Sequence, residues 1–97
     1  MSTYVILTRV TEETDTNPAH FRDLAEQVES RVKRECPAVT WKESFSTAGS
    51  CDVVDILESD DAAEVQKAAM LIRDVAHART ETLAATPWKH FLAVHQG

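Results

Sequence analysis

The sequence predicts an α+β fold in which the elements follow the order strand, helix, strand, strand, helix, strand. Runs rich in β-branched and aromatic residues predict the strands, and apolar residues at three- and four-residue spacing predict two amphipathic helices. A four-residue turn joins the two middle strands, which makes them an antiparallel hairpin. With 97 residues, 43% hydrophobic and 27% charged, residues 1–97 are expected to form one globular domain.

The first predicted strand, residues 3–10, is apolar on both faces. Tyr4 and Ile6 lie on one side, and Val5 and Leu7 lie on the other. A strand with two apolar faces is usually covered on both. Since the predicted helices cover only one face of the sheet, we expect the other face to pack against a second copy of the chain.

Two helices are predicted from their start signals and their apolar stripes. The first has Asn17 as its N-cap and Pro18 as its first helical residue, and it ends before Pro37. The second opens at Asp61, with Glu64 in a capping-box-like position. The two apolar stripes are Phe21, Leu24, Ala25, Val28 and Val32, and then Ala62, Val65, Ala68, Ala69 and Ile72.

The remaining strands are predicted at residues 39–46, 51–58 and 78–85, with a turn at 47–50. Strict alternation in the first of them places four side chains on one face, namely Val39, Trp41, Glu43 and Phe45. The short apolar tail at residues 90–95 is expected to form an extra strand or a turn.

Charge and composition exclude several classes of protein. The formal net charge of −6 is opposite in sign to the basic footprint of a nucleic-acid binder, so no nucleic-acid partner is expected. No apolar run approaches the ~20 residues that span a membrane, and no signal-peptide pattern precedes the first strand. Without an export signal the protein is expected in the cytoplasm, with Cys36 and Cys51 as reduced thiols.

Right-handed crossovers would place both helices on one face of a four-stranded antiparallel sheet, the ferredoxin-like βαββαβ arrangement. Four segments then resemble the GYD-domain family. Residues 1–11 are similar to its opening strand, and residues 47–54 to the Gly-Tyr-Asp segment that names it. Residues 58–63 look like its step into the second helix, and residues 79–83 like its fourth strand.

The resemblance implies a dimeric α+β barrel, in which two ferredoxin-like subunits pack sheet to sheet. Relatives of that fold include small monooxygenases, isomerases, haem proteins and the effector-binding domains of Lrp-like regulators, so the fold leaves the activity open. One position departs from the family pattern: Gly49 and Asp52 match it, but Cys51 stands where the family has Tyr. If that phenol ordinarily contacts a ligand, the contact is lost or changed here.

Candidate ligand-binding residues gather around this segment. Gly49 is expected at a turn position with positive φ. Asp52 is either a turn cap or a carboxylate at a pocket mouth, and Asp55 is expected to share its strand face. Such a carboxylate pair could bind a cation or raise the pKa of one member, unless one of them points to solvent. Cys51 is a poor nucleophile candidate, because a neighbouring carboxylate disfavours the thiolate.

A second set of candidates lies on or near other strands. His77 and Arg79 are expected side by side, where they could hold a carboxylate ligand or form only a surface pair. Trp41 is either a ligand contact or part of the core or dimer interface. The four histidines show no metal-ligand spacing, and no phosphate loop or paired-cysteine motif is present, so neither a metal nor a cofactor is expected.

Three functions remain open from the sequence. The first is a homo-oligomeric binding or regulatory module that holds a small organic ligand between sheet and helices. The second is a cofactor-independent enzyme of the monooxygenase or isomerase type, with His77 as acid–base, Arg79 as anion anchor and Asp52 as a polar orienter. The third is a purely structural oligomer.

Overall fold

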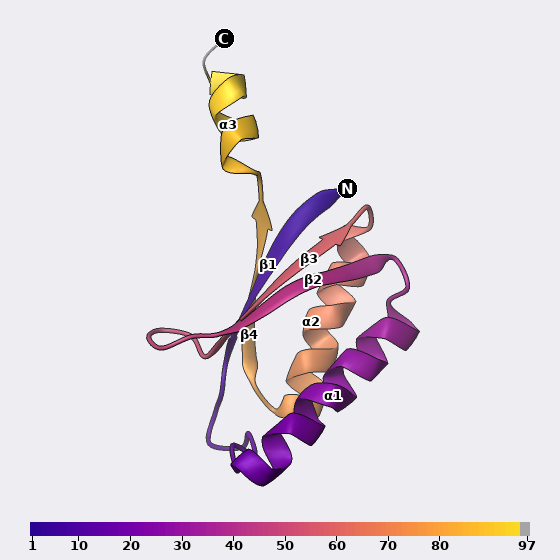
Figure 1. The fold of residues 1–97 in the computed structure, drawn as a ribbon. Helices are drawn as coiled ribbons and strands as arrows, with labels where there is room; N and C mark the ends of the chain where they lie inside the picture. The colour runs from indigo at the N-terminus through magenta and orange to yellow at the C-terminus, as the bar shows by residue number, and fades with distance from the viewer. Residues whose placement is uncertain (96–97) are drawn as a thin grey trace.

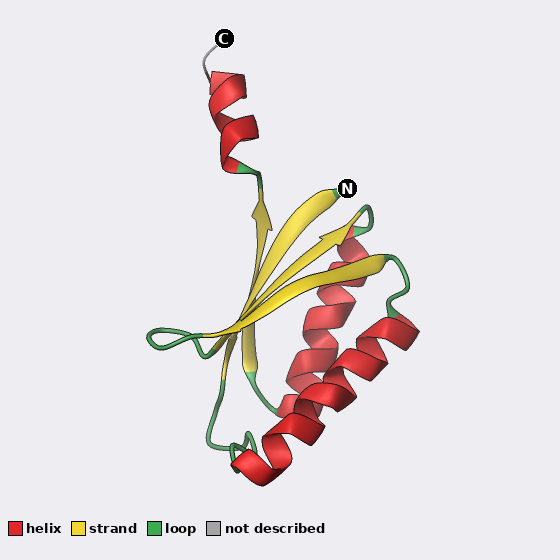
Figure 2. Ribbon diagram, viewed as in Figure 1, coloured by secondary structure: helices red, strands yellow, loops and turns green. Residues whose placement is uncertain are grey.

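The computed structural model describes residues 1–95 and has a four-stranded antiparallel sheet with the two long helices on one face (Figures 1 and 2). In chain order the elements are β1 (Ser2–Arg9), α1 (Pro18–Glu35), β2 (Val39–Ser46), β3 (Val53–Ser59), α2 (Ala62–Ala76), β4 (Arg79–Ala85) and α3 (Trp88–His95). The strand order is β2-β3-β1-β4, which confirms the predicted ferredoxin-like fold. No helix within residues 1–95 has the length and apolarity needed to cross a bilayer.

The predicted N-caps start both helices. Asn17 caps α1 and Asp61 caps α2, and each side chain accepts a hydrogen bond from the backbone N–H two residues on, at 2.9 and 3.0 Å. The reciprocal half of the capping box at α2 is absent. The Asp61 N–H donates to the Ser59 hydroxyl at 3.0 Å, while Glu64 accepts from the Ala38 N–H at 3.3 Å. Glu64 therefore ties α2 to the start of β2.

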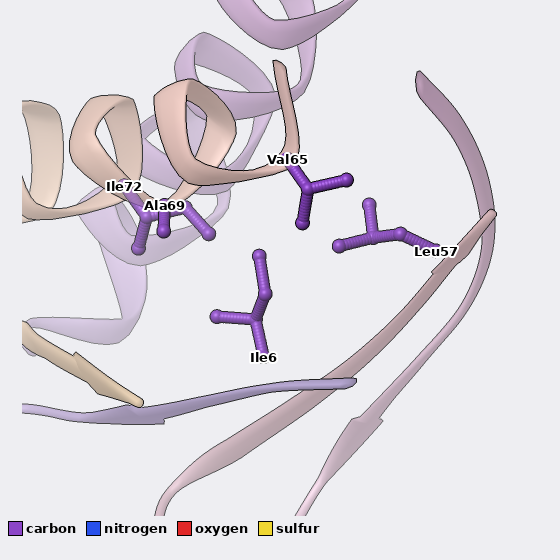
Figure 3. Close-up of a cluster of buried hydrophobic side chains, with 5 residues drawn as sticks. All are labelled: Ile6, Leu57, Val65, Ala69 and Ile72. Atoms are coloured by element: carbon purple, nitrogen blue, oxygen red, sulfur yellow. The ribbon is translucent and has the colours of Figure 1, made fainter. Parts of the chain in front are cut away.

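The core lies between α2 and the sheet (Figure 3). Its centre is a fully buried cluster of Ile6, Leu57, Val65, Ala69 and Ile72. A second buried cluster, Val32, Cys36, Ala68 and Leu71, joins the end of α1 to α2. Helix α2 therefore packs directly on the sheet, and the end of α1 packs against α2.

The face of the sheet opposite the helices carries an apolar strip. Residues directly opposite each other on paired strands share a face. Val5 lies opposite Ile56 of β3 and Leu83 of β4, and Leu7 lies opposite Val54. With Phe45 of β2 the set is Val5, Leu7, Phe45, Val54, Ile56 and Leu83, here called the open-face strip. The two apolar faces expected of β1 are thus both present.

The alternation predicted for β2 is wrong beyond Trp41. Trp41 lies opposite Leu57 on the helix side of the sheet, but Glu43 lies opposite Ile56 on the other side. One extra residue between them forms a β-bulge, which moves every later side chain to the opposite face. Phe45 consequently belongs to the open-face strip rather than sharing a face with Trp41.

The C-terminal segment also differs from the prediction. Instead of a strand or turn it forms α3, which begins after Pro87 with the Phe91 N–H bonded to the Pro87 carbonyl at 3.0 Å. Trp88 and Phe91 stack with ring centroids 5.7 Å apart, a contact that helical i,i+3 spacing makes possible. Helix α3 projects beyond the sheet (Figure 1), and the radius of gyration of 14.4 Å exceeds the roughly 12.5 Å of a compact chain this long.

Candidate functional site

A cavity of about 830 Å³ lies between α1 and the β2–β3 side of the sheet. Its walls are mainly apolar and include Phe21, Leu24, Val28, Trp41, Ala76 and Ala78. The cavity explains why only Val32 of the predicted α1 stripe is buried. The earlier members of that stripe line the cavity, and of these Val28 also packs against the core.

Contacts near the C-terminal end of α1 hold that end against α2. Arg31 donates from Nε to Glu35 at 2.9 Å and from Nη1 to Asp74 of α2 at 3.1 Å. The guanidinium keeps the pKa of Glu35 below its usual value, chiefly through the hydrogen bond. Val32 is buried one residue further along. The N-terminal half of α1, which carries Phe21 and Leu24, lines the cavity instead.

A short chain of hydrogen bonds forms the polar centre of the cavity. Trp41 Nε1 donates to Ser44 Oγ at 2.8 Å, and Ser44 Oγ donates to Asp55 Oδ1 at 2.6 Å. Asp55 is only 5% exposed and sits on the helix side of β3, opposite Ser44 and Ile6. The bulge in β2 lets Ser44 face the same side as Trp41, so all three polar groups meet.

Burial raises the pKa of Asp55, because the charged carboxylate loses solvation. The hydrogen bond from Ser44 and the indole N–H of Trp41 behind it act in the opposite direction, since both stabilise the charged form. The carboxyl of Asp55 is therefore easier to protonate than an exposed aspartate.

The free energy of unfolding should depend on pH in a way that reports the raised pKa of Asp55. Between about pH 4, where Asp titrates in an unfolded chain, and the raised pKa of Asp55, the folded protein binds more protons than the unfolded one. The Asp55 contribution to the free energy of unfolding therefore falls as pH rises through that window. Denaturant titrations across this range should show Asp55→Asn gaining stability relative to the wild type as pH increases. Parallel curves for the two proteins would contradict the assignment.

Asp52 and Trp41 are the sequence-predicted candidates that line the cavity. Asp52 Oδ2 accepts from the Val10 N–H at 2.9 Å, so it joins the start of β3 to the end of β1. Asp52 and Asp55 both line the cavity, but they do not share a strand as expected. Asp52 precedes β3, which begins at Val53, and the two carboxylates bond different partners, Val10 and Ser44.

Gly49 and Cys51 lie in the loop between β2 and β3. Gly49 has φ of 141°, which confirms the expected positive-φ turn position. The third strand starts two residues later than predicted, because a bond from the Thr47 N–H to the Asp52 carbonyl at 2.9 Å closes the loop first. The Thr47 hydroxyl donates to the Cys51 carbonyl at 2.7 Å. Neither Gly49 nor Cys51 is part of the cavity lining.

His77 and Arg79 do not belong to the cavity lining, although Ala76 and Ala78 do. His77 ends α2 in a left-handed conformation (φ 53°, ψ 38°), and its carbonyl accepts from the hydroxyls of Thr11 at 2.6 Å and Thr14 at 3.0 Å. Its side chain is exposed. Arg79, also exposed, begins β4 opposite Arg9, on the face of the sheet that the helices leave open. The two residues therefore do not meet Asp52 at one site.

Comparison with known proteins identifies the family. A match to the GYD domain covers residues 4–94. The chain belongs to the GYD-domain family. A search of curated proteins finds no match to this GYD-domain chain.

Solved structures similar to this GYD domain share its fold. The leucine response regulatory protein LrpA of Mycobacterium tuberculosis aligns with a TM-score of 0.61 at 15% identity, over 89% of this chain and 51% of LrpA. The chain thus spans about half the length of that protein. TTHA0845 of Thermus thermophilus aligns with a TM-score of 0.55 at 25% identity, over 90% of this chain and 95% of TTHA0845. The hypothetical protein PHS023 of Pyrococcus horikoshii aligns with a TM-score of 0.56 at 22% identity, over 93% of this chain and 95% of PHS023.

Two polar residues of the cavity in this GYD domain are missed by the sequence reasoning. The sequence suggests Asp55 only as a possible partner of Asp52. A carboxylate between Val54 and Ile56 in an apolar strand is nevertheless a signal of a buried polar site. Strict alternation puts Ser44 on the wrong side of β2 relative to Trp41, because the bulge has no clear mark in the sequence.

Proposed function

We propose that residues 1–97 of this GYD domain act as one homo-oligomeric module that binds a small organic ligand in the cavity beside α1. The observation that carries the proposal is an apolar cavity of about 830 Å³ with the buried carboxylate of Asp55 at its polar centre. Ligand sites typically measure roughly 300–1,000 Å³ and combine apolar walls with a few convergent polar groups. A stable two-layer domain of this size would otherwise close such a space by packing.

The partner in the oligomer is a second copy of the chain, placed against the open-face strip. Contiguous apolar patches are rare on monomers, and this strip runs across all four strands. Phe45 and Leu83 are 47% and 41% exposed, so the strip has large apolar side chains available for contact. A two-fold dimer would pair the strip with itself and form a dimeric α+β barrel.

The two thiols support a reducing compartment, the cytoplasm. Cys36 and Cys51 are both free, and structural disulfides are rare in that compartment. Burial raises the pKa of the Cys36 thiol, which disfavours the reactive thiolate and suits a packing role.

A second candidate function is cofactor-independent acid–base catalysis in the same cavity. The raised pKa of Asp55 favours it, because a carboxyl that holds its proton more readily than an exposed aspartate is better suited to donate it to a substrate. Asp55 then takes the acid–base role that the sequence had suggested for His77. Asp52, which also lines the cavity, keeps its suggested role as a polar orienter.

The binding function is tested by filling the cavity. Thermal denaturation with a library of small organic molecules should reveal ligands that stabilise the wild type, since a ligand at 100 times its dissociation constant adds about 2.7 kcal/mol. Ala25→Trp should abolish these shifts, because Ala25 lines the cavity. Ala19→Trp is the matched control, on an exposed position of the same helix outside the lining.

The outcomes separate the functions. Ligand-dependent shifts that A25W loses and A19W keeps support a binding module. Turnover of such a ligand, lost in Asp55→Asn, would establish the enzyme instead. If native mass spectrometry finds a dimer with no bound molecule and the library gives no shift, the protein is a structural oligomer and the proposal fails.

A further inference from the structure

We propose that the ligand of this cavity is a small organic amine, whose ammonium group docks on Asp55 and whose apolar body lies against the walls. The inference rests on the proposed binding function and adds the chemical class of the ligand. It is carried by the charges around the cavity, by the hydrogen-bond partners of Asp55 and by the nature of the walls.

The charged residues that line the cavity are mostly acidic. Three carboxylates, those of Glu29, Asp52 and Asp55, accompany one ammonium group, that of Lys42. Glu43 also contributes to the lining, but its register opposite Ile56 turns its side chain to the other face of the sheet. Lys42 itself lies 3.8 Å from a carboxylate oxygen of Glu58, which partly neutralises it. An anionic ligand would meet like charges on entry, whereas a cation is attracted. The field of the cavity thus selects positive charge.

Asp55 is a buried carboxylate that lacks a counter-ion within residues 1–95. Its donor is the Ser44 hydroxyl, at 2.6 Å from Oδ1, and that hydroxyl in turn accepts the Trp41 indole N–H at 2.8 Å, so both neighbouring groups are neutral. The ion pairs of the described residues do not include Asp55. A buried charge is costly unless it is paired, and an ionised carboxylate accepts about four hydrogen bonds. An ammonium group supplies both the missing charge and further donors.

The neighbours of Asp55 suit the rest of an amine. Phe21, Leu24 and Val28 of α1 form an apolar wall, and Trp41 presents an indole next to the carboxylate. Aromatic faces attract ammonium groups through the ring quadrupole, most strongly for Trp. An arylalkyl or alkyl chain would replace water along the wall, while Asp55 and Trp41 hold the head group.

The test uses three probes with one apolar body and three head groups: 3-phenylpropylamine, 3-phenylpropan-1-ol and 3-phenylpropionate. The chain has two tryptophans, so Trp88→Phe leaves Trp41 as the sole indole reporter of binding. We expect the amine to bind at least ~10-fold more tightly than the alcohol, and the carboxylate to bind most weakly. This ranking is measured without altering the cavity.

Two variants assign the preference to a residue. Asp55→Asn should reduce the advantage of the amine over the alcohol to about twofold or less, because it removes the charge and keeps the shape. Glu43→Gln, the matched control, removes an exposed carboxylate that β2 turns to the opposite face of the sheet, and it should keep most of the advantage. If Asp55→Asn does not fold, the order of affinities for the three probes in the W88F protein still tests whether the cavity prefers an amine.

Failure of this inference is distinct from failure of the binding function. If the alcohol or the carboxylate binds as well as the amine, the cavity binds organic molecules but the assignment to amines is overturned. The same holds if Asp55→Asn keeps the full preference. If none of the three probes binds at millimolar concentration, the inference is also overturned, and the library screen with A25W and A19W then judges the binding function by itself.

Discussion

Replacing Leu83 with Glu is expected to dissociate the proposed oligomer into monomers, with an increase of at least ~100-fold in the dissociation constant. Leu83 lies opposite Val5 in the open-face strip and is 41% exposed in the single chain. The new carboxylate is tolerated in a monomer because water reaches it. In a sheet-to-sheet dimer it would be buried against apolar side chains without a partner, once from each subunit. Sedimentation equilibrium over a range of protein concentrations measures the change.

Thr82→Glu provides the matched control for this experiment. Thr82 precedes Leu83 in β4 and is also exposed, but it lies opposite Ile6 on the helix side of the sheet. It introduces the same charge into the same strand on the other face, so T82E should remain oligomeric. A wild type that is monomeric at all concentrations, or equal dissociation in both variants, would refute association through this face.

Replacing Leu57 with Ala is expected to lower the free energy of unfolding by about 2–5 kcal/mol. Leu57 is fully buried in the centre of β3, and it packs with Ile6 and Val65 in the cluster of Figure 3. Removal of its side-chain carbons leaves a space that the sheet cannot close by collapse, because β1 and β2 pair with β3 on either side. Urea denaturation at one fixed protein concentration gives the difference, since the stability of an oligomer depends on concentration.

Met70→Ala is the comparison for this loss. Met70 belongs to α2 but is 58% exposed, so its truncation should change the free energy of unfolding by less than about 1 kcal/mol. A similar small change for Leu57→Ala would mean that the space beneath α2 is not the centre of stability. The cavity beside α1 would then be part of a loosely packed interior instead of a separate site.

The sequence predicted the elements whose causes are local. Asn17 before Pro18 and Asp61 before the second apolar stripe mark helix starts through side-chain hydrogen bonds that span only two residues. The two-sided β1 followed from the alternation of Tyr4 to Leu7, which needs no knowledge of distant residues. From these elements the order of strands and the two-layer architecture follow by general rules of connection.

The sequence did not predict the parts of the site that depend on distant contacts. The cavity exists because Arg31 and Val32 hold the end of α1 to α2, while Phe21 lines the cavity instead of the core. The apolar spacing along α1 would be the same whether the start of the helix packed on the core or lined a cavity. The meeting of Ser44 with Asp55 depends on how β2 pairs with β3 around its extra residue. Tertiary pairing, rather than local preference, decides both features.

The extra residue in β2 has a consequence for how copies of this chain avoid one another. Because β2 is an edge of the sheet, its outer backbone N–H and C=O groups would invite a strand from a neighbouring molecule, and repeated strand addition leads to filaments. A bulge interrupts the regular spacing of those groups, and the lysine ammonium of Lys42 at the bulge would be desolvated by an incoming strand. Growth of a filament along this edge is therefore opposed.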